Sequence, residues 1–454
     1  MTASASPVPF REALRAWTKI GLLSFGGPAG QIATMHRILV EEKRWIGESR
    51  FLHALNYCML LPGPEATQLA AYIGWLLHRT LGGIVAGVLF VLPGAVVMVC
   101  LSALYAGYRH LPAVDAVFFG IKAAVLAVVV EAVLRIGRRA LRNPARVALA
   151  GLAFVGIFLF AVPFPLIVLA AGVAGLIGAR LRPDWFADGG GHGPAKDKAI
   201  LDALIDEKLL THVDPTPGRA LRVLLVWGAI WAAPVLVAAL ALGSSHVLVA
   251  EGLFFSKVAV VTFGGAYAVL AYVAQQAVEH YAWLAPGEML DGLGMAETTP
   301  GPLILVLTFI GYLAGYRHGA PLDPAMAGVL GAALTTWVTF VPSFLFIFLG
   351  APYVERLRGN AWASGALSAI TAAVVGVVLN LAVWFALHVV FRDHAGWSFG
   401  WMQLDLPVWS SLDLPALVLA AAAMLAMFRF KLGMIPVLAG AATLGLAWRY
   451  FTGT

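Results

Sequence analysis

Residues 24–37 read SFGGPAGQIATMHR, and residues 261–276 read VTFGGAYAVLAYVAQQ. The Phe-Gly-Gly of the first stretch begins at Phe25, and that of the second begins at Phe263, 238 positions later. Both glycine pairs interrupt apolar runs, and glycine lowers the cost of leaving helical geometry. The two stretches therefore predict a helix that is broken at the same place in two copies of one folding unit.

A second motif recurs at the same distance. Pro-Gly-Pro at residues 62–64 returns at residues 300–302, again 238 positions later. Farther along, Pro93 corresponds to Pro342 at a distance of 249. One insertion between these positions accounts for the change of spacing, so the motifs describe two homologous halves.

The composition indicates the environment in which these halves fold. Hydrophobic residues make up 61% of the 454 residues, and charged residues make up only 12%. A soluble domain carries roughly 25% charged residues. Apolar runs of about 20 residues, the length that spans a bilayer core, recur along the whole chain. The composition therefore predicts an all-α polytopic membrane protein and argues against a large soluble helical one.

The apolar runs predict about 12–13 transmembrane segments, some of them broken or re-entrant helices. Their approximate bounds are 11–36, 54–77, 82–106, 115–134, 147–163, 165–180, 222–243, 253–275, 289–312, 325–350, 364–391, 412–428 and 432–451. The hydrophilic stretch 181–221 separates an N-terminal repeat, residues 1–180, from a C-terminal repeat, residues 222–454. Its Gly, Pro and alternating charges are typical of a tether between domains.

The loop that contains Arg135, Arg138 and Arg142 has no acidic residue of its own, which places it in the cytoplasm together with the N-terminus and the linker. Seven segments separate the starts of the two repeats, so we expect inverted topology. Inverted repeats are the physical basis of alternating access in many transporters.

The breaks predict where a ligand binds. Proline removes a helical hydrogen bond, and a helix that restarts at membrane depth presents N–H groups and a dipole that favour an anion. Each motif by itself also fits a simple packing kink; the pairing favours a site. The residues expected to contact substrate are Phe25, Gly26, Gly27, Gln31, Pro62, Gly63, Pro64, Gln68, Phe263, Gly264, Gly265, Thr298, Thr299, Pro300, Gly301 and Pro302.

Three lysines are candidates for positive potential at that site. Lys19 and Lys257 occupy matching places about two turns before the glycine pairs, and Lys122 lies in the fourth segment. Ionisable residues inside a membrane are functional candidates by default. For Lys19 and Lys257, a side chain that extends to the membrane surface is an equally good interpretation.

Two acids are candidates for proton coupling. Glu65 directly follows Pro64, and Glu297 lies just before Pro300. Glu65 also fits a helix cap, because a carboxylate suits the first turn. Glu131 is expected to pair with Arg135 one turn on.

The quoted stretches, together with residues 50–80 and 296–312, resemble the chromate ion transporter family in its long, two-domain bacterial form. The resemblance covers nearly all of both halves except the linker and the last two segments. It implies a multi-pass protein of the cell inner membrane that transports chromate, with efflux that confers chromate resistance. It also implies sulfate as a competing ligand and suggests coupling to protons.

Other functional classes lack their signals. We expect no enzyme, no catalytic residues, no cofactor and no metal site, because no dinucleotide-binding fingerprint or paired haem ligands are present. No basic stripe interleaved with aromatic residues predicts nucleic-acid binding. The sequence leaves open sulfate or another oxyanion as substrate, and a channel in place of a transporter. Abundant small residues suit helix packing within the chain or in a homodimer.

Overall fold

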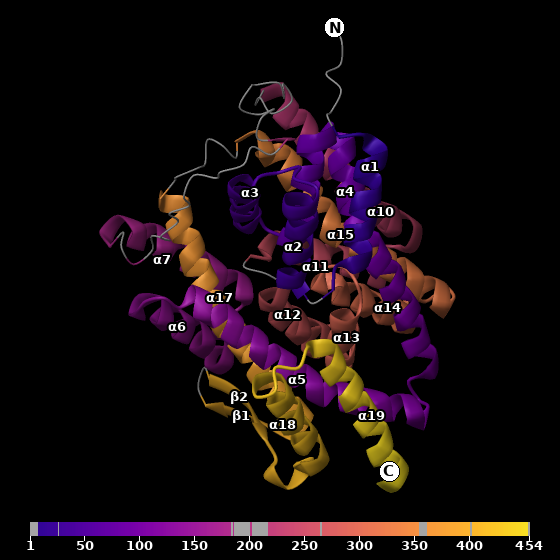
Figure 1. Ribbon diagram of the computed structural model, residues 1–454. Helices are drawn as coiled ribbons and strands as arrows, with labels where there is room; N and C mark the ends of the chain where they lie inside the picture. The colour runs from indigo at the N-terminus through magenta and orange to yellow at the C-terminus, as the bar shows by residue number, and fades with distance from the viewer. Residues whose placement is uncertain are drawn as a thin grey trace. The chain divides into compact units, whose positions relative to one another are not determined.

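The computed structural model describes residues 8–25, 27–182, 185, 200–201, 217–263, 266–353, 361–399 and 402–452. Over these residues the chain is an all-α polytopic membrane protein with one short β-hairpin (Figure 1). Seven described helices are long and apolar enough to cross a membrane, and three more apolar helices have 10–17 residues. The predicted fold class is confirmed.

The chain divides into two compact units that each draw on both halves of the sequence. The first contains Met1–Cys100, Gly189–Ala266 and Thr299–Asn360, and the second contains Leu101–Asp188, Tyr267–Thr298 and Ala361–Thr454. The predicted division into 1–180, 181–221 and 222–454 describes the sequence repeat and stays a prediction. Most of the linker lies outside the described residues.

Several helices of the first unit pack against α15. Close approach of α14 and α15 depends on small residues, since a side chain on Gly328 would meet the ring of Tyr312 and one on Gly331 the carbonyl of Gly311. Helices α10 and α11 also pack against α15. The elements are α1 (Phe10–Leu23), α2 (Gly27–His36), π-helix η1 (Arg37–Glu42), α3 (Glu48–Leu60), α4 (Glu65–Tyr108, which ends in the second unit), α10 (Pro217–Leu242), α11 (Val247–Val261), η4 (Leu303–Leu305), α14 (Val306–His318), α15 (Pro324–Gly350) and η5 (Ala351–Tyr353).

The second unit is organised around α5 and α17. Helix α17 packs against α5, α6 and α7, and α5 also packs against α18 and α19. The elements are α5 (Pro112–Ala140), α6 (Pro144–Phe160), α7 (Phe164–Leu181), α12 (Ala266–Gln275, which starts in the first unit), π-helix η3 (Gln276–His280), α13 (Pro286–Thr298), α17 (Ala361–Val390), β1 (His394–Phe399), β2 (Met402–Pro407), η6 (Trp409–Ser411), α18 (Leu414–Phe428) and α19 (Met434–Thr452).

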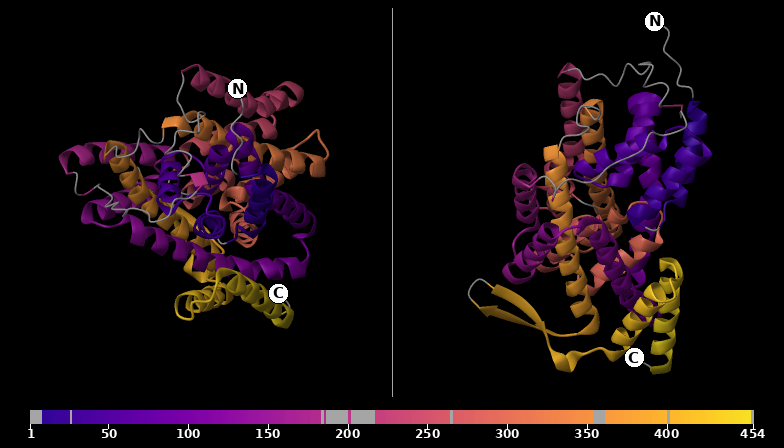
Figure 2. Two further views of the ribbon diagram at one scale, coloured as in Figure 1. Left: turned by 45° about the horizontal axis from the view of Figure 1, so that its top comes forward. Right: turned by 60° about the vertical axis from the view of Figure 1, so that its left-hand side comes forward.

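The β-hairpin was not predicted. Strands β1 and β2 pair antiparallel between α17 and α18, with His394 opposite Pro407 (Figure 2). This stretch lies between two apolar runs and is too short for a hydrophobic pattern to identify it.

Four predicted segments are broken, as the glycine and proline motifs indicated. Runs 11–36, 54–77, 253–275 and 289–312 each appear as two helices separated by non-helical residues. Helices α3 and α13 have 13 residues each, about 20 Å, which is less than a bilayer core of about 30 Å. Helix α4 joins two predicted segments through non-helical backbone at His78 and Arg79.

The duplication is visible in the local backbone. Each copy contains a π-helical turn, η1 in the first and η3 in the second. After these turns, Arg44 and Ala282 have the same left-handed φ of 52° and lie 238 positions apart. Helices α3 and α13 begin and end at matching positions. The opposite orientation of the two copies stays a prediction.

Candidate functional site

Each Pro-Gly-Pro motif separates two helices with a glycine in the left-handed region. The first break lies between α3 and α4, where Gly63 has φ of 116°; the second lies between α13 and η4, where Gly301 has φ of 92°. Side chains rarely adopt such φ values, so both positions favour glycine. The breaks predicted from sequence are therefore real interruptions of the helix backbone.

Within the first unit, the two breaks are held by a reciprocal pair of hydrogen bonds. The amide of Gly63 donates to the carbonyl of Thr262, and the amide of Gly301 donates to the carbonyl of Ser24, each at 2.8 Å. Ser24 and Thr262 are themselves 238 positions apart and directly precede the two Phe-Gly-Gly motifs. The break of one copy is thus tied to the glycine motif of the other, and these glycine amides already have acceptors.

Polar side chains line the first break. The Nε2 of Gln68 donates to the carbonyl of Pro62 at 2.6 Å. A Cβ added to Gly63 would lie 2.9 Å from that Nε2 and 3.1 Å from the Oγ of Ser343 on α15. Within the described part of the chain, Gln68 Oε1, Thr67 Oγ1 and Ser343 Oγ are buried without a hydrogen-bond partner. Unpartnered buried polar groups are costly, and they mark a place where a polar ligand would fit.

The second break has a different lining. Gly301 lies beside Leu305 and Gly94, whose Cα would be 3.5 Å from an added Cβ. A side chain on Gly94 would collide with the carbonyl of Pro300. The polar contact here is made by Gln31, whose Nε2 donates to the carbonyl of Gly301 at 2.6 Å. Gln31 therefore belongs to the second break and Gln68 to the first.

The glycine motifs are only partly described. Phe25 is 36% exposed, and Phe263 is half-buried. Gly27 has a left-handed φ of 67° with open space beside it. The predicted site residues Gly26, Gly264 and Gly265 lie outside the described residues.

The three lysines have different surroundings. Lys19 forms an ion pair of 3.1 Å with Glu42, and its side chain is 51% exposed. Lys257 is also exposed. Lys122 is largely buried, and its Nζ lies 3.4 Å from Oδ2 of Asp291. Of the three, Lys122 is the one held inside the protein.

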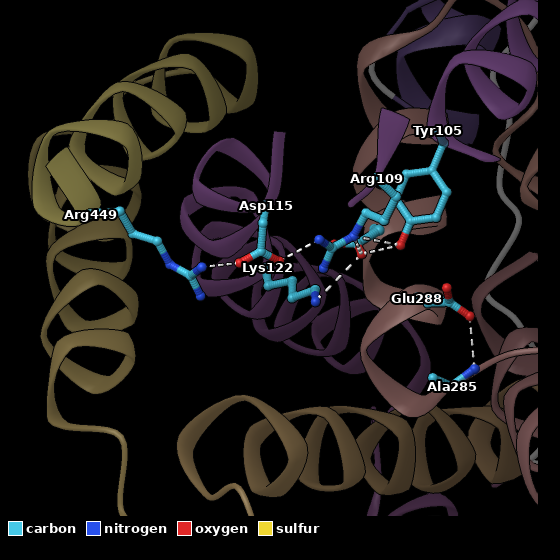
Figure 3. A network of polar contacts seen from close by, with 8 residues as sticks. Tyr105, Arg109, Asp115, Lys122, Ala285, Glu288 and Arg449 are labelled. Atoms are coloured by element: carbon cyan, nitrogen blue, oxygen red, sulfur yellow. Dashed lines mark hydrogen bonds and ion pairs between the residues drawn. The ribbon is translucent and has the colours of Figure 1, made fainter. Parts of the chain in front are cut away.

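Lys122 belongs to a polar network within the second unit that the sequence did not predict (Figure 3). Asp291, on α13, is fully buried and accepts a hydrogen bond of 2.7 Å from the hydroxyl of Tyr105. Arg109 lies 3.6 Å from the same carboxylate oxygen and also pairs with Asp115. Asp115 in turn pairs with Arg449 of α19. Lys122 and Arg109 therefore lie close to the buried Asp291 carboxylate, and Arg109 and Arg449 both pair with Asp115.

Arg109 lies in the connection between α4 and α5. Desolvation by burial lowers the pKa of its guanidinium, but Asp291 and the hydrogen bonds to Asp115 and Tyr105 raise it by more, so the net shift is upward. Arg109 is accordingly a permanent cation in this network. Asp291 lacked a sequence signal, because α13 carries three acids, Glu288, Asp291 and Glu297, and their spacing does not indicate which of them meets Lys122.

The remaining predicted residues lie beside the two breaks in sequence. Glu297 is buried and accepts a hydrogen bond from the hydroxyl of Tyr267. The hydroxyl of Thr298 donates to backbone carbonyls of its own helix, including Gly294 at 3.1 Å. Thr299 is buried, and Glu65 is half-buried in the first turn of α4.

Glu131 forms the expected ion pair with Arg135, at 3.0 Å and one turn apart. This confirms the structural role predicted for it.

Comparison with known proteins identifies the same repeats. Residues 11–176 and 250–446 match the chromate transporter family. The chromate transport protein of Pseudomonas aeruginosa is 33% identical over 380 residues, which cover 82% of this chain and 80% of that protein. The chromate transport protein of Cupriavidus metallidurans is 26% identical over 98% of this chain and 94% of that protein. A probable chromate transport protein of Synechococcus elongatus is 26% identical over 82% of this chain and 84% of that protein. No solved structure matches the chain.

Proposed function

The chain belongs to the chromate transporter family, and from this premise we propose that it moves chromate across the membrane at the paired breaks. The observation that carries the proposal is the reciprocal bonding of Gly63 to Thr262 and of Gly301 to Ser24. Within the first unit, it joins each break to the residue that precedes the Phe-Gly-Gly motif of the other copy. Two similar broken helices are the elements that repeat transporters use to hold a ligand near the bilayer midplane.

The oxyanion would contact the first break. A tetrahedral dianion needs several hydrogen-bond donors. The hydroxyls of Ser343 and Thr67 can donate to it, and the amide nitrogen of Gln68 has a second N–H besides the one bonded to the Pro62 carbonyl. The first turn of α4 adds N–H groups without helical acceptors. Neutral donors around a dianion recognise charge and shape, so sulfate is the competing ligand that this lining would also accept.

Transport by alternating access follows from the duplication, because two similar copies give two similar conformations. We propose efflux from the cytoplasm across a bacterial inner membrane, without enzymatic chemistry. Proton coupling would involve Glu65 in the first turn of α4 and Glu297 beside Tyr267. Lys122, the largely buried lysine of the polar network, would attract the anion toward the protein.

The test measures chromate accumulation in intact cells that lack other chromate exporters. Cells with the intact protein should accumulate less chromate than cells without it, and the double variant Gly63→Leu with Gly301→Leu should abolish the difference. Gly107→Leu serves as the matched control, because open space surrounds that glycine. Immunoblots of the membrane fraction report whether each variant is inserted.

Three results would contradict parts of the proposal. Equal accumulation with and without the inserted protein would exclude chromate as substrate. Higher accumulation with it would mean uptake in place of efflux. Flux that never exceeds the imposed gradient, whatever ion gradient is supplied, would indicate a channel.

A further inference from the structure

Glu251 is a carboxyl group that the proposed transport route does not use. It lies in the second turn of α11 and is 0% exposed. Within the described part of the chain, neither carboxylate oxygen has a hydrogen-bond partner, and the adjacent polar side chain is that of Thr335. Its Oε2 lies against Gly331 of α15, where an added Cβ would be only 2.9 Å away. The carboxyl group is therefore packed tightly between helices.

Over the described residues, no countercharge compensates this carboxyl group. Helix α11 packs against α10, α14 and α15. Together with α11 and its ends, these elements carry the following other charged or titratable side chains: Arg219, Arg222, His246, Lys257, Tyr312, Tyr316, Arg317, His318 and Asp323, which caps α15. Among the described residues, none of these interacts with the Glu251 carboxylate. An ionised carboxylate without partner or water is strongly disfavoured, so the packed arrangement requires the neutral, protonated form.

Helix α15 connects Glu251 to the first break. Thr335, Thr339 and Ser343 lie four residues apart on α15, and all three are buried. Thr335 is next to Glu251, and Ser343 is next to Gly63. Eight residues of helix span about 12 Å. A movement of α15 that admits water to Glu251 would therefore also move Ser343 at the break.

The first copy has no counterpart of this arrangement. The position equivalent to Glu251 is Ala13, and those equivalent to Thr335 and Ser343 are Ala86 and Gly94. Of the two copies, only the second therefore carries an acid and polar side chains at these positions.

We infer that Glu251 is a proton-binding site of the transport cycle, protonated while α11 packs on α15 and ionised when that packing opens to water. The proton adds to one carboxylate oxygen from the aqueous phase on one side and leaves to water on the other. This inference rests on the proposed function and deepens it, since it adds to Glu65 and Glu297 a third carboxyl group, one that links a proton gradient to the movement of α15 beside the substrate.

The first test uses purified protein in liposomes and measures chromate accumulation with and without an imposed pH gradient. In the intact protein the gradient should raise accumulation about tenfold. In Glu251→Gln, which mimics the protonated form, the ratio should fall to about one while chromate exchange at equal pH persists at a measurable rate. The matched control Glu12→Gln, whose parent side chain forms an exposed pair with Lys43, should keep the ratio of the intact protein.

Two outcomes of this test would overturn the inference. One is a Glu251→Gln protein that still accumulates chromate under a pH gradient as the intact protein does. The other is a sodium gradient that replaces the pH gradient, because a bound sodium ion would then explain the buried carboxylate.

A second measurement does not depend on chromate. Infrared difference spectra of the purified protein between acidic and alkaline pH should contain a protonated-carboxyl C=O band that is missing in Glu251→Gln. Identical spectra of the two proteins would overturn the inference. If the intact protein moved no chromate at all, the proposed function would fail, and the carboxyl band would still decide whether Glu251 binds a proton.

Discussion

At the first break Gly63 lies between Gln68 and Ser343, whereas at the second break Gly301 lies between Leu305 and Gly94. The backbone is the same in both places, with a positive φ and an amide bonded to the other copy. The positions that line the breaks correspond in sequence but differ in chemistry. Thr67, Gln68 and Ser343 of the first break correspond to Leu305, Val306 and Gly94 of the second.

The difference separates two roles of the duplicated Pro-Gly-Pro motif: interrupting the helix and lining a ligand site. Both breaks need glycine and proline, because the chain must leave helical geometry there. Only the first has buried polar atoms without partners among the described residues. A polar ligand is therefore expected at the first break, and close backbone packing at the second.

The largest effect is expected from Gly94→Val at the second break. The new side chain would overlap the carbonyl of Pro300, and forced overpacking costs about 1–3 kcal/mol or more. We expect the amount of folded protein in the membrane to fall severalfold and its Tm to drop by several degrees, measured by fluorescence-detected gel filtration. Gly107→Val on the same helix is the control. Equal Tm values for the two variants would contradict close packing at the second break.

The next largest effect is expected from substitutions of the two break glycines, Gly63 and Gly301. Gly63→Ala and Gly301→Ala should each lower the stability by about 1–3 kcal/mol, because both place a side chain at positive φ. Transport should distinguish them, since the methyl group added to Gly63 would press on Gln68 and Ser343. We expect the KM for chromate to rise about tenfold in Gly63→Ala and less than threefold in Gly301→Ala. Equal rises would mean that both breaks contact the substrate.

A smaller effect is expected from Ser343→Ala. Its hydroxyl has no partner among the described residues, so the Tm should change little. The loss of one hydrogen bond to the anion, about 1 kcal/mol, should raise the KM about fivefold. Thr336→Ala on the same helix removes the 2.8 Å contact with Thr308 and should lower the Tm slightly without changing the KM. The reverse pattern would remove Ser343 from the site.

The smallest effect is expected from Lys19→Gln, away from both breaks. The pair with Glu42 is exposed, and such pairs contribute about 0–1 kcal/mol. We expect a change in Tm of less than about 2 °C and a KM within about twofold of the intact protein. A tenfold rise in the KM would show that Lys19 acts on the substrate in spite of its exposure.

The sequence predicted features whose cause is local. The four broken segments follow from glycine and proline, which act on the backbone within one turn. The ion pair of Glu131 with Arg135 could be predicted because one helical turn fixes the distance between the two residues. The partner of Lys122 could not be predicted. Asp291 is distant from it in sequence, and no periodicity connects the two residues.

The sequence by itself therefore determined the membrane class, the duplication and the positions of the breaks, because composition and backbone preferences are properties of short stretches. The tertiary structure alone brought Ser343 to Thr67 and Gln68 at the first break. Ser343 reaches Gly63 and Gly94 reaches Gly301 only through packing between the copies. It also buried Glu251 and Asp291, since burial depends on which helices pack against a side chain, and neighbours in sequence do not specify that.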